Sequence, residues 1–418
     1  MNHVDTIAPM GRQDGNEEVI APFRIDVPDA DRDDLRTRLA LARWPDAPGA
    51  SDWSRGVPAD YLRNLADYWR DAFDWRMQED RLNAWPQFTT VIDGQVIHFV
   101  HVRSREPDAL PLILTHGWPS SFIELTNLIG PLVDPVAHGG DARDAFDVVI
   151  PSLPGFGYSN PVNGDGRGNI FAIAMMWDEL MRRLGYERYA AQGGDIGAGV
   201  TSVLGVVAPH RVVATHVTGP VPFPFGPGLE VESFSGRDRL RAERFNQWQR
   251  DGIGYLHLQA TRPQTIGYSL VDSPTGLLAW IVEKVREWTD PAADLPEEAV
   301  DRDQLLATVS LYWFTRSGAS SAKIVYEGMQ AYRAFAEQSS DGDAGEWDAD
   351  RMVPPHGVAV FAADNSIRGH LFPHGGPDHW SEFDRGGHFP AMETPDLLVD
   401  DIRAFTRSYR QGGSPSTS

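Results

Sequence analysis

GGDIGAG, residues Gly193–Gly199, crowds four glycines around one acid and one isoleucine directly after the apolar run YERYAAQ. An aspartate among glycines is most often an ordinary turn residue. The segment Gly193–Gly197 also has the spacing G-x-Nu-x-G of a nucleophile elbow, in which a strand turns sharply into a helix and exposes a reactive side chain. Asp195 would then stand where esterases carry serine, and the residues around this turn have to decide between the two interpretations.

Short apolar runs alternate with helical patterns on both sides of the turn. The runs are PLILTH (111–116), FDVVIP (146–151), YAAQ (189–192) and VVATHV (212–217). Strands that alternate with helices predict an α/β fold with a mostly parallel, doubly wound sheet. In such a sheet, ligands bind beyond the carboxyl ends of the strands, which is where each of these runs places its polar residues.

The chain divides into six segments by pattern. We predict a disordered tail (1–20), an N-terminal helical meander (21–92), the first part of the core (93–220), a helical lid (221–350), the second part of the core (351–410) and a disordered tail (411–418). Within them, Asp93-Gly94 predicts a hairpin, and Ser273-Pro274 predicts the start of a lid helix. We expect the lid to be inserted after the sixth core strand.

Charge and composition exclude several classes of function. The formal net charge of −22 disfavours nucleic acid and anionic membrane surfaces as partners, so a neutral or apolar small molecule fits better. The chain has no cysteine, which excludes disulfides, thiolate nucleophiles and cysteine-based zinc sites. Neither a signal peptide nor a membrane anchor is evident. We therefore expect a soluble, cytoplasmic protein without cofactor or metal, and leave a homodimer open.

The order of polar residues along the chain favours a reactive Asp195. Asp364 follows it by about 170 residues after the apolar run GVAVFAA, and His388 comes last in a glycine turn. Nucleophile, acid and histidine occur in this order in α/β-hydrolases. The backbone N–H groups of Ile196 and Trp118 then occupy the positions of an oxyanion hole, since the proline after Trp118 has no N–H to give.

Over nearly its whole length the chain resembles the epoxide hydrolases of the microsomal type, in their soluble bacterial branch. The resemblance rests on PFRIDVPDADRDDLRTRLALARWPD, DYWRDAFDWRMQEDRLNAWPQFTT, DGQVIHFVHVRS, LILTHGWPSSFIEL, PSLPGFGYS, GGDIGAG, GIGYLHLQATRPQTIGYSLVDSPTGLLAWIVEKVREWTD and RGGHFPAMETPDLL. It implies that the N-terminal meander clasps the lid. It also implies that two lid tyrosines, Tyr255 and Tyr326, hold the epoxide oxygen.

The chemistry that this resemblance implies suits the residue types. A carboxylate with a pKa of about 3.9 is ionised at neutral pH, so Asp195 can attack an epoxide carbon without a base. Phenols can donate a proton as the alkoxide develops. His388, oriented by Asp364, would then activate water to hydrolyse the ester on Asp195 and release a vicinal diol.

Two positions depart from the pattern of the relatives. Many of them carry tryptophan after the nucleophile, where this chain has Ile196, so one wall of the pocket changes while the backbone donor remains. Mammalian members have an N-terminal anchor and a glutamate as the orienting acid, where this chain has Asp364. Asp378 and Asp384 lie near it in sequence and stay open as alternatives.

Other functions and sites compete with this interpretation. A haloalkane dehalogenase uses the same nucleophile, and a non-catalytic binding protein can share the fold, whereas a dinucleotide-binding loop would not place an acid at the pyrophosphate. The histidine cluster in HLFPHGGPDHW suggests a metal site, but its prolines and glycines favour a solvated loop. The aromatic content suggests a bulky apolar or aromatic epoxide, from secondary metabolism or detoxification.

Overall fold

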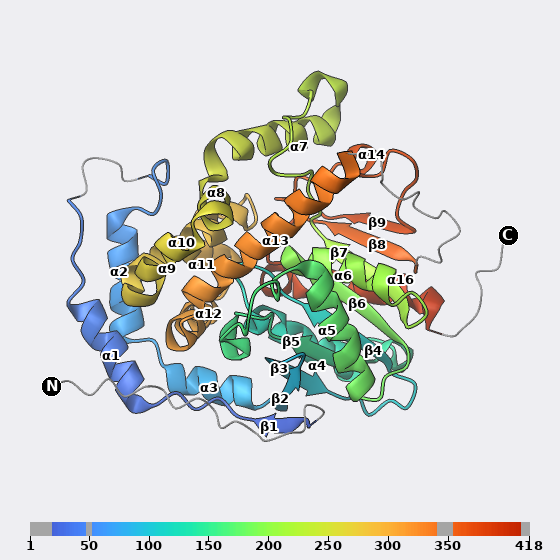
Figure 1. Ribbon diagram of the computed structural model, residues 1–418, viewed down its shortest axis with the longest axis horizontal. Coiled ribbons are helices and arrows are strands. Elements are labelled where there is room, and N and C mark those ends of the chain that lie inside the picture. The colour runs from blue at the N-terminus through green and yellow to red at the C-terminus, as the bar shows by residue number, and fades with distance from the viewer. Residues whose placement is uncertain (1–18, 47–51, 341–353, 411–418) are drawn as a thin grey trace.

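A mixed sheet forms the centre of the computed structural model, which describes residues 19–46, 52–340 and 354–410. Figure 1 shows the sheet with helices on both faces and a helical layer above one end. Nine strands are described: β1 (Ala21–Phe23), β2 (Gln87–Ile92), β3 (Gln95–Val102), β4 (Leu110–Thr115), β5 (Phe146–Pro151), β6 (Tyr189–Gly194), β7 (Val212–Thr218), β8 (His356–Val360) and β9 (His379–Glu382). The predicted tails lie almost wholly outside the described residues.

The sheet runs in the order β1-β2-β3-β5-β4-β6-β7-β8-β9. The pairs from β1 to β5 are antiparallel, and every pair from β5 to β9 is parallel. The predicted doubly wound, mostly parallel sheet is therefore confirmed. Its central strands are buried on both faces, which explains why they read as continuous apolar runs in the sequence.

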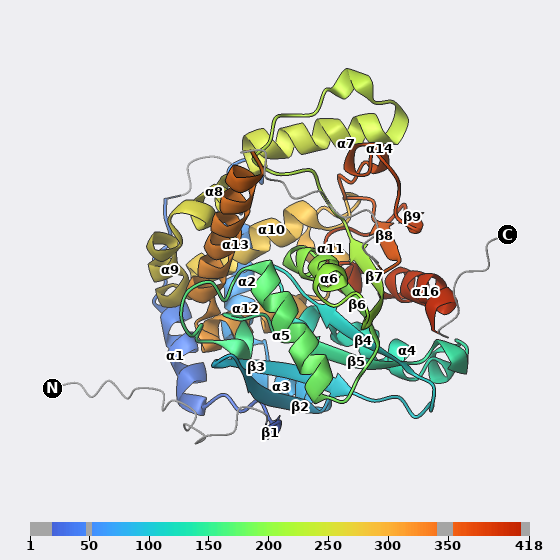
Figure 2. The ribbon, with the colours of Figure 1, turned by 45° about the vertical axis from the view of Figure 1, so that its right-hand side comes forward.

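Two pairs of helices cover the two faces of the sheet, as Figure 2 shows. On one face α5 (Ile170–Arg183) packs on α6 (Ile196–Val207), and on the other α4 (Thr126–Val133) packs on α16 (Pro395–Thr406). Two short helices, α14 (Arg368–Leu371) and α15 (Pro390–Glu393), lie in the C-terminal part. Single 3₁₀ turns are η1 (Phe122–Leu125), η2 (Val136–His138), η3 (Ala142–Asp144), η4 (Gly157–Ser159), η5 (Val231–Ser233) and η7 (Arg407–Tyr409).

The lid is helical and lies between β7 and β8 in the chain. Its elements are α7 (Gly236–Gln247), the π-helix η6 (Trp248–Gly252), α8 (Gly254–Thr261), α9 (Pro263–Asp272), α10 (Pro274–Trp288), α11 (Pro296–Ala299), α12 (Arg302–Thr315) and α13 (Ser317–Ser340). The predicted start of α10 is confirmed, since the Ser273 hydroxyl accepts the Gly276 N–H at 3.1 Å. The chain leaves the sheet and enters the lid after β7, which is the sixth strand in chain order when the short β1 is not counted.

The N-terminal segment packs against one side of the lid. Its helices are α1 (Asp29–Ala40), α2 (Ala59–Asp71) and α3 (Trp75–Asn83), and Figure 1 shows the blue α1 and α2 beside the yellow lid helices. Trp69 on α2 donates its indole N–H to the hydroxyl of Ser310 on α12 at 2.8 Å, and both residues are buried. The segment also contains β1, which no prediction had included, and β2, which is the first strand of the predicted hairpin. The prediction of a purely helical segment for residues 21–92 was therefore wrong at both ends.

Candidate active site

The turn between β6 and α6 holds Asp195 in a strained backbone conformation. Its φ of 55° and ψ of −124° are unfavourable for a residue with a side chain and cost on the order of 1–3 kcal/mol. The surrounding glycines make this turn sterically possible. A Cβ on Gly197 would lie 2.0 Å from the carbonyl oxygen of Thr115, and one on Gly193 would lie 2.4 Å from the Gly197 carbonyl oxygen. Asp195 therefore projects from a tightly packed turn at the carboxyl end of β6.

Two backbone N–H groups face the carboxylate of Asp195. The N–H of Trp118, in the loop after β4, donates to Oδ1 at 2.9 Å, and the N–H of Ile196 bonds to the same carboxylate. Burial favours the neutral acid, but the neighbouring His388 and the two N–H groups outweigh it, so the pKa of Asp195 lies below its usual range. The carboxylate is ionised at neutral pH and contacts two backbone N–H donors.

His388 lies in the loop before α15 and faces Asp195. Its Nε2 is 3.6 Å from Oδ2 of Asp195, and its own backbone N–H donates to the Trp288 carbonyl at 2.8 Å. The imidazole ring contacts the rings of Trp288 and Phe389, whose centroids lie 4.9 and 5.0 Å from its own. Burial lowers the pKa of His388, but the negative charges of Asp195 and the other acids nearby reverse this, and the net pKa is raised.

Asp364 lies in the turn that follows β8, four residues after its last residue Val360. It is buried, and its Oδ2 accepts the backbone N–H of Phe361 at 2.7 Å. Burial raises the pKa of Asp364 to about 6, although the charge of His388 counteracts this. Among the described residues, His388 forms its ion pair with Asp195, and Asp364 acts on it through charge at longer range.

The two acids that the sequence left open are placed elsewhere. Asp378 accepts the backbone N–H of His356 at 2.8 Å, at the amino end of β8. Asp384 is exposed. Of the three acids, only Asp364 is among those whose charge raises the pKa of His388.

The two tyrosines named from the resemblance differ from each other in how they are placed relative to Asp195. The ring of Tyr255, on α8, stacks on the ring of Trp118 at 5.0 Å and 9°. Burial raises the pKa of Tyr255 well above its usual range, and the charge of Asp195 adds to this. Tyr326, on α13, is half-buried, and within the described part of the chain no hydrogen bond, ring contact or charge interaction joins it to Asp195.

Two further residues near Asp195 were missed by the sequence interpretation. Tyr312 on α12 is buried and donates its hydroxyl to the Ser120 carbonyl at 2.8 Å, and nothing in its apolar helix distinguishes it from the ten other tyrosines. Glu124 on η1 is 8% exposed. A single acid in the apolar run FIEL was a signal that could have drawn attention to it.

His116, directly after β4, is a structural member of its turn. Its Nδ1 lies 3.1 Å from the Gly117 carbonyl, and its Nε2 lies 3.1 Å from the backbone N–H of Leu153. Nε2 must accept from that N–H, so the ring is neutral with its proton on Nδ1. Burial agrees with this, because it lowers the pKa of His116 to about 4.

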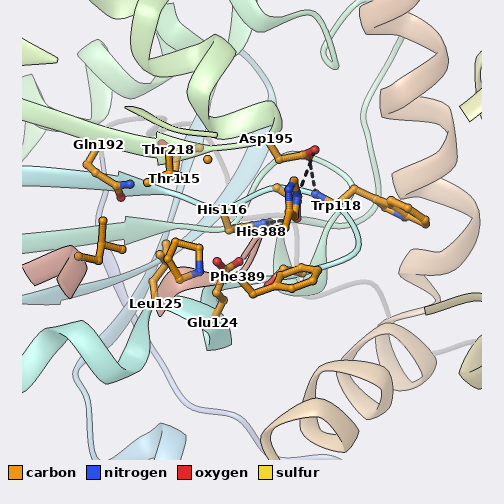
Figure 3. Close-up of a pocket in the computed structure, with 15 residues that line it drawn as sticks. Thr115, His116, Trp118, Glu124, Leu125, Gln192, Asp195, Thr218, His388 and Phe389 are labelled. Carbon is orange, nitrogen blue, oxygen red and sulfur yellow. Dashed lines mark hydrogen bonds and ion pairs between the residues drawn. The ribbon is translucent and has the colours of Figure 1, made fainter. Parts of the chain in front are cut away.

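A cavity connects Asp195 with His388 and Glu124. Figure 3 shows Asp195 with its contacts to Trp118 and His388, with Glu124 below the imidazole and Gln192 on the side of the sheet. The lining residues are Thr115, His116, Gly117, Trp118, Ser120, Glu124, Leu125, Gln192, Gly194, Asp195, Thr218, His388, Phe389, Pro390 and Leu398. The walls combine an ionised carboxylate, an imidazole and backbone N–H donors, which is a set suited to forming and hydrolysing an ester.

The histidine cluster near the C-terminus lies apart from this cavity. His379, on β9, bonds through Nε2 to Oδ1 of Asp401 at 2.8 Å, and the other oxygen of Asp401 lies 2.8 Å from Nε2 of His216. Within residues 19–46, 52–340 and 354–410, no three His, Cys, Asp or Glu side chains are placed to hold a metal ion together. Across the same residues, no helix combines the length and apolar character needed to cross a bilayer.

Two family models match the chain. The model described as "Epoxide hydrolase N terminus" matches residues 20–125, and the model described as "alpha/beta hydrolase fold" matches residues 111–316. Together they cover the N-terminal segment, the first part of the core and most of the lid.

Similar proteins match over nearly the whole length. A protein of Stigmatella aurantiaca named "Putative epoxide hydrolase" is 44% identical over 94% of this chain and 86% of its own length. "Epoxide hydrolase 1" of Sus scrofa is 33% identical over 93% of this chain and 89% of its own. The solved structure of Aspergillus niger epoxide hydrolase superposes with a TM-score of 0.79 at 32% identity, covering 94% of this chain and 97% of that one.

Proposed function

Because the chain belongs to the epoxide hydrolases, and is thus a hydrolase that acts on epoxides, we propose that it converts an apolar or aromatic epoxide to a vicinal diol through a covalent ester on Asp195. The observation that carries this proposal is the placement of an ionised carboxylate between two backbone N–H donors and an imidazole. An ester of Asp195 formed there would have both its oxyanion hole and its base in place.

In the first half-reaction, a carboxylate oxygen of Asp195 attacks one epoxide carbon and the C–O bond of the ring breaks. The oxygen released from the ring takes a proton from a phenol of the lid. Tyr255 supports this role, because its ring is held against Trp118 and Asp195 lies close enough to influence its pKa. Tyr326 remains the second phenol that the family resemblance implies. The product is a hydroxyalkyl ester of Asp195.

In the second half-reaction, His388 removes a proton from a water molecule, whose oxygen attacks the carbonyl carbon of the ester. The N–H groups of Trp118 and Ile196 stabilise the tetrahedral oxyanion. The intermediate collapses with cleavage of the bond to the alkyl oxygen, which takes its proton from His388 and leaves as part of the diol. Asp364 stabilises the protonated imidazole by charge. The proton left on the carboxyl group of Asp195 returns to the phenolate of the lid, so the Asp195 carboxylate and the phenol are both regenerated.

We further propose that the enzyme acts in the cytoplasm, with the epoxide and water as its reaction partners and without nucleic acid or membrane. The net charge of −22 supports the exclusion of polyanionic partners. A homodimer remains compatible with this function, because all the proposed site residues lie within one chain.

The test uses styrene oxide and two variants. The wild-type protein should produce the diol. His388→Gln should stop after the first half-reaction, so that intact-protein mass spectrometry finds the protein heavier by one substrate, with the added mass on the peptide that contains Asp195. Asp195→Asn should neither turn over nor gain mass. Diol formation by Asp195→Asn at the wild-type rate would overturn the proposal, as would halide release from a haloalkane without any diol from the epoxide.

A further inference from the structure

Glu124 is a buried acid that faces the catalytic cavity. It is 8% exposed and lines the same cavity as Asp195 and His388. Figure 3 shows its carboxylate pointing into this cavity on the side of His388. We propose that Glu124 is a positioning residue for ester hydrolysis, which holds the attacking water against His388 and the ester of Asp195. This role rests on the function proposed above.

The partners of Glu124 leave its carboxylate available to a water molecule. Among the described residues, no hydrogen bond of normal geometry reaches its side chain, and the hydroxyl of Ser120 nearby has no partner either. The charges of His388 and Asp195 act on Glu124 through space. Glu393, a half-buried acid five residues after His388, differs from Glu124, because each of its two oxygens accepts a backbone N–H group, from Phe389 and Asp290. A buried carboxylate with unused acceptor sites is costly unless water or substrate satisfies them.

The lid fixes the loop that carries Glu124. Ser121 caps η1 by accepting the Ile123 N–H at 3.2 Å. From α12, the Tyr312 hydroxyl donates to the Ser120 carbonyl at 2.8 Å, and the Gln304 amide donates to the Ile123 carbonyl at 3.1 Å. These contacts hold the backbone on both sides of Glu124, so the carboxylate has a defined place in the cavity.

The charges around Glu124 favour a role in the second half-reaction. Burial raises the pKa of Glu124 to about 7, with the His388 charge acting against the rise and the Asp195 charge adding to it. Esterification removes the charge of Asp195, which is one of the causes that raise the pKa of Glu124, so Glu124 ionises more readily once the ester exists. The acceptor is thus strengthened at the stage when water must be oriented.

A water molecule can link Glu124 to His388 without direct contact between the two side chains. In the described part of the chain, His388 is ion-paired with Asp195 and not with Glu124, so the imidazole and the second carboxylate are separated by more than a direct contact. Such a separation between two polar groups is commonly bridged by water. The water gives one proton to His388 and donates its other O–H to Glu124 without transferring that proton, and its oxygen bonds to the ester carbon.

The experiment is rapid-quench single turnover with styrene oxide, which follows the ester by intact-protein mass and the diol by chromatography. Glu124→Gln keeps the shape and removes the charge. We expect ester formation within about 2-fold of wild type and hydrolysis about 10- to 100-fold slower, the effect of one charge-assisted hydrogen bond. The ester should therefore accumulate, and Glu124→Asp should restore part of the hydrolysis rate.

Glu79→Gln serves as the matched control, because Glu79 is equally buried but lies on α3, where it bonds to Val27 and Trp75 away from the cavity. Neither rate constant should change in this variant. Ester hydrolysis at the wild-type rate in Glu124→Gln would overturn the role of Glu124, as would an equal loss in both steps. A wild-type protein that forms diol without any ester would instead overturn the ester mechanism itself.

Discussion

Replacing Asp364 with asparagine removes one buried charge while preserving the turn that carries it. The asparagine side chain can still accept the Phe361 N–H, and Arg244 still donates to the backbone carbonyl of residue 364, which the wild-type structure places at 2.7 Å. The imidazole of His388 keeps its own contacts with Trp288. The variant therefore isolates the electrostatic effect of Asp364 on His388.

The size of this effect follows from the separation of the two groups. Opposite charges 4 Å apart interact by about 4 kcal/mol at an effective dielectric constant of about 20. Asp364 and His388 are not in direct ion-pair contact within the described chain, so we expect a smaller effect of about 2–3 kcal/mol. This corresponds to a loss of roughly 30- to 150-fold in ester hydrolysis, the step in which His388 carries a proton.

Single-turnover kinetics with an aryl epoxide measures this loss, and the pH profile adds a second readout. The charge of Asp364 raises the pKa of His388, and His388 must be neutral to act as a base. In Asp364→Asn that pKa falls, so the acidic limb of the hydrolysis profile should shift to lower pH. Asp378→Asn and Asp384→Asn are the controls. Hydrolysis by Asp364→Asn within about 3-fold of wild type, or an equal loss in Asp384→Asn, would refute this reasoning.

Three further predictions concern the lid, the elbow and the C-terminal core. Tyr255→Phe should slow ester formation about 10²- to 10⁴-fold in rapid-quench experiments. A comparable loss in Tyr326→Phe would show that both phenols act on the epoxide. Wild-type rates of ester formation in both variants would contradict a role for either tyrosine. Gly197→Ala should abolish turnover and lower the melting temperature, because its Cβ would lie 2.0 Å from a backbone oxygen of β4. Gly199→Ala is the control and should be tolerated, since its Cβ would meet the nearest side chain at 3.5 Å. Equal activity and melting temperature in the two variants would contradict the steric argument. Burial raises the pKa of Asp401, but hydrogen bonds and charge from His216, Ser381 and His379 outweigh this and lower it to about 2. The ionised form of Asp401 therefore stabilises the fold above about pH 4. This contribution of about 2 kcal/mol is lost as the pH falls toward 2. Urea unfolding of Asp401→Asn should therefore show a deficit that shrinks over that interval, and a deficit independent of pH would count against it.

The parts of the fold that follow local rules could be predicted from the sequence. The central strands appear as apolar runs because helices cover both faces of the sheet, and the Ser273 cap and the Asp93-Gly94 hairpin depend only on neighbouring residues. The short strand β1 could not be predicted in this way. It exists because β2 offers an edge for it to pair with, and that edge is formed by residues more than 60 positions later in the chain.

In the candidate site, too, the features set by neighbouring residues could be predicted, and those set by distant residues could not. Asp195 and the glycines of its turn form a local pattern that the sequence displays directly. Asp364 was assigned to the end of a strand, but β8 ends at Val360 and the acid sits in the following turn, where its charge reaches His388. Glu124 could not be assigned, because its significance comes from the folding of η1 against the lid and from the charges that meet in the cavity.

The most direct test of the central claim is a single turnover of an aryl epoxide in ¹⁸O-labelled water with enzyme in excess. If Asp195 forms the ester and water attacks its carbonyl carbon, the first diol contains only unlabelled oxygen, and the label appears in the peptide that contains Asp195. Label in the first diol with none in that peptide would mean that water opens the epoxide directly, and it would contradict Asp195 as the nucleophile.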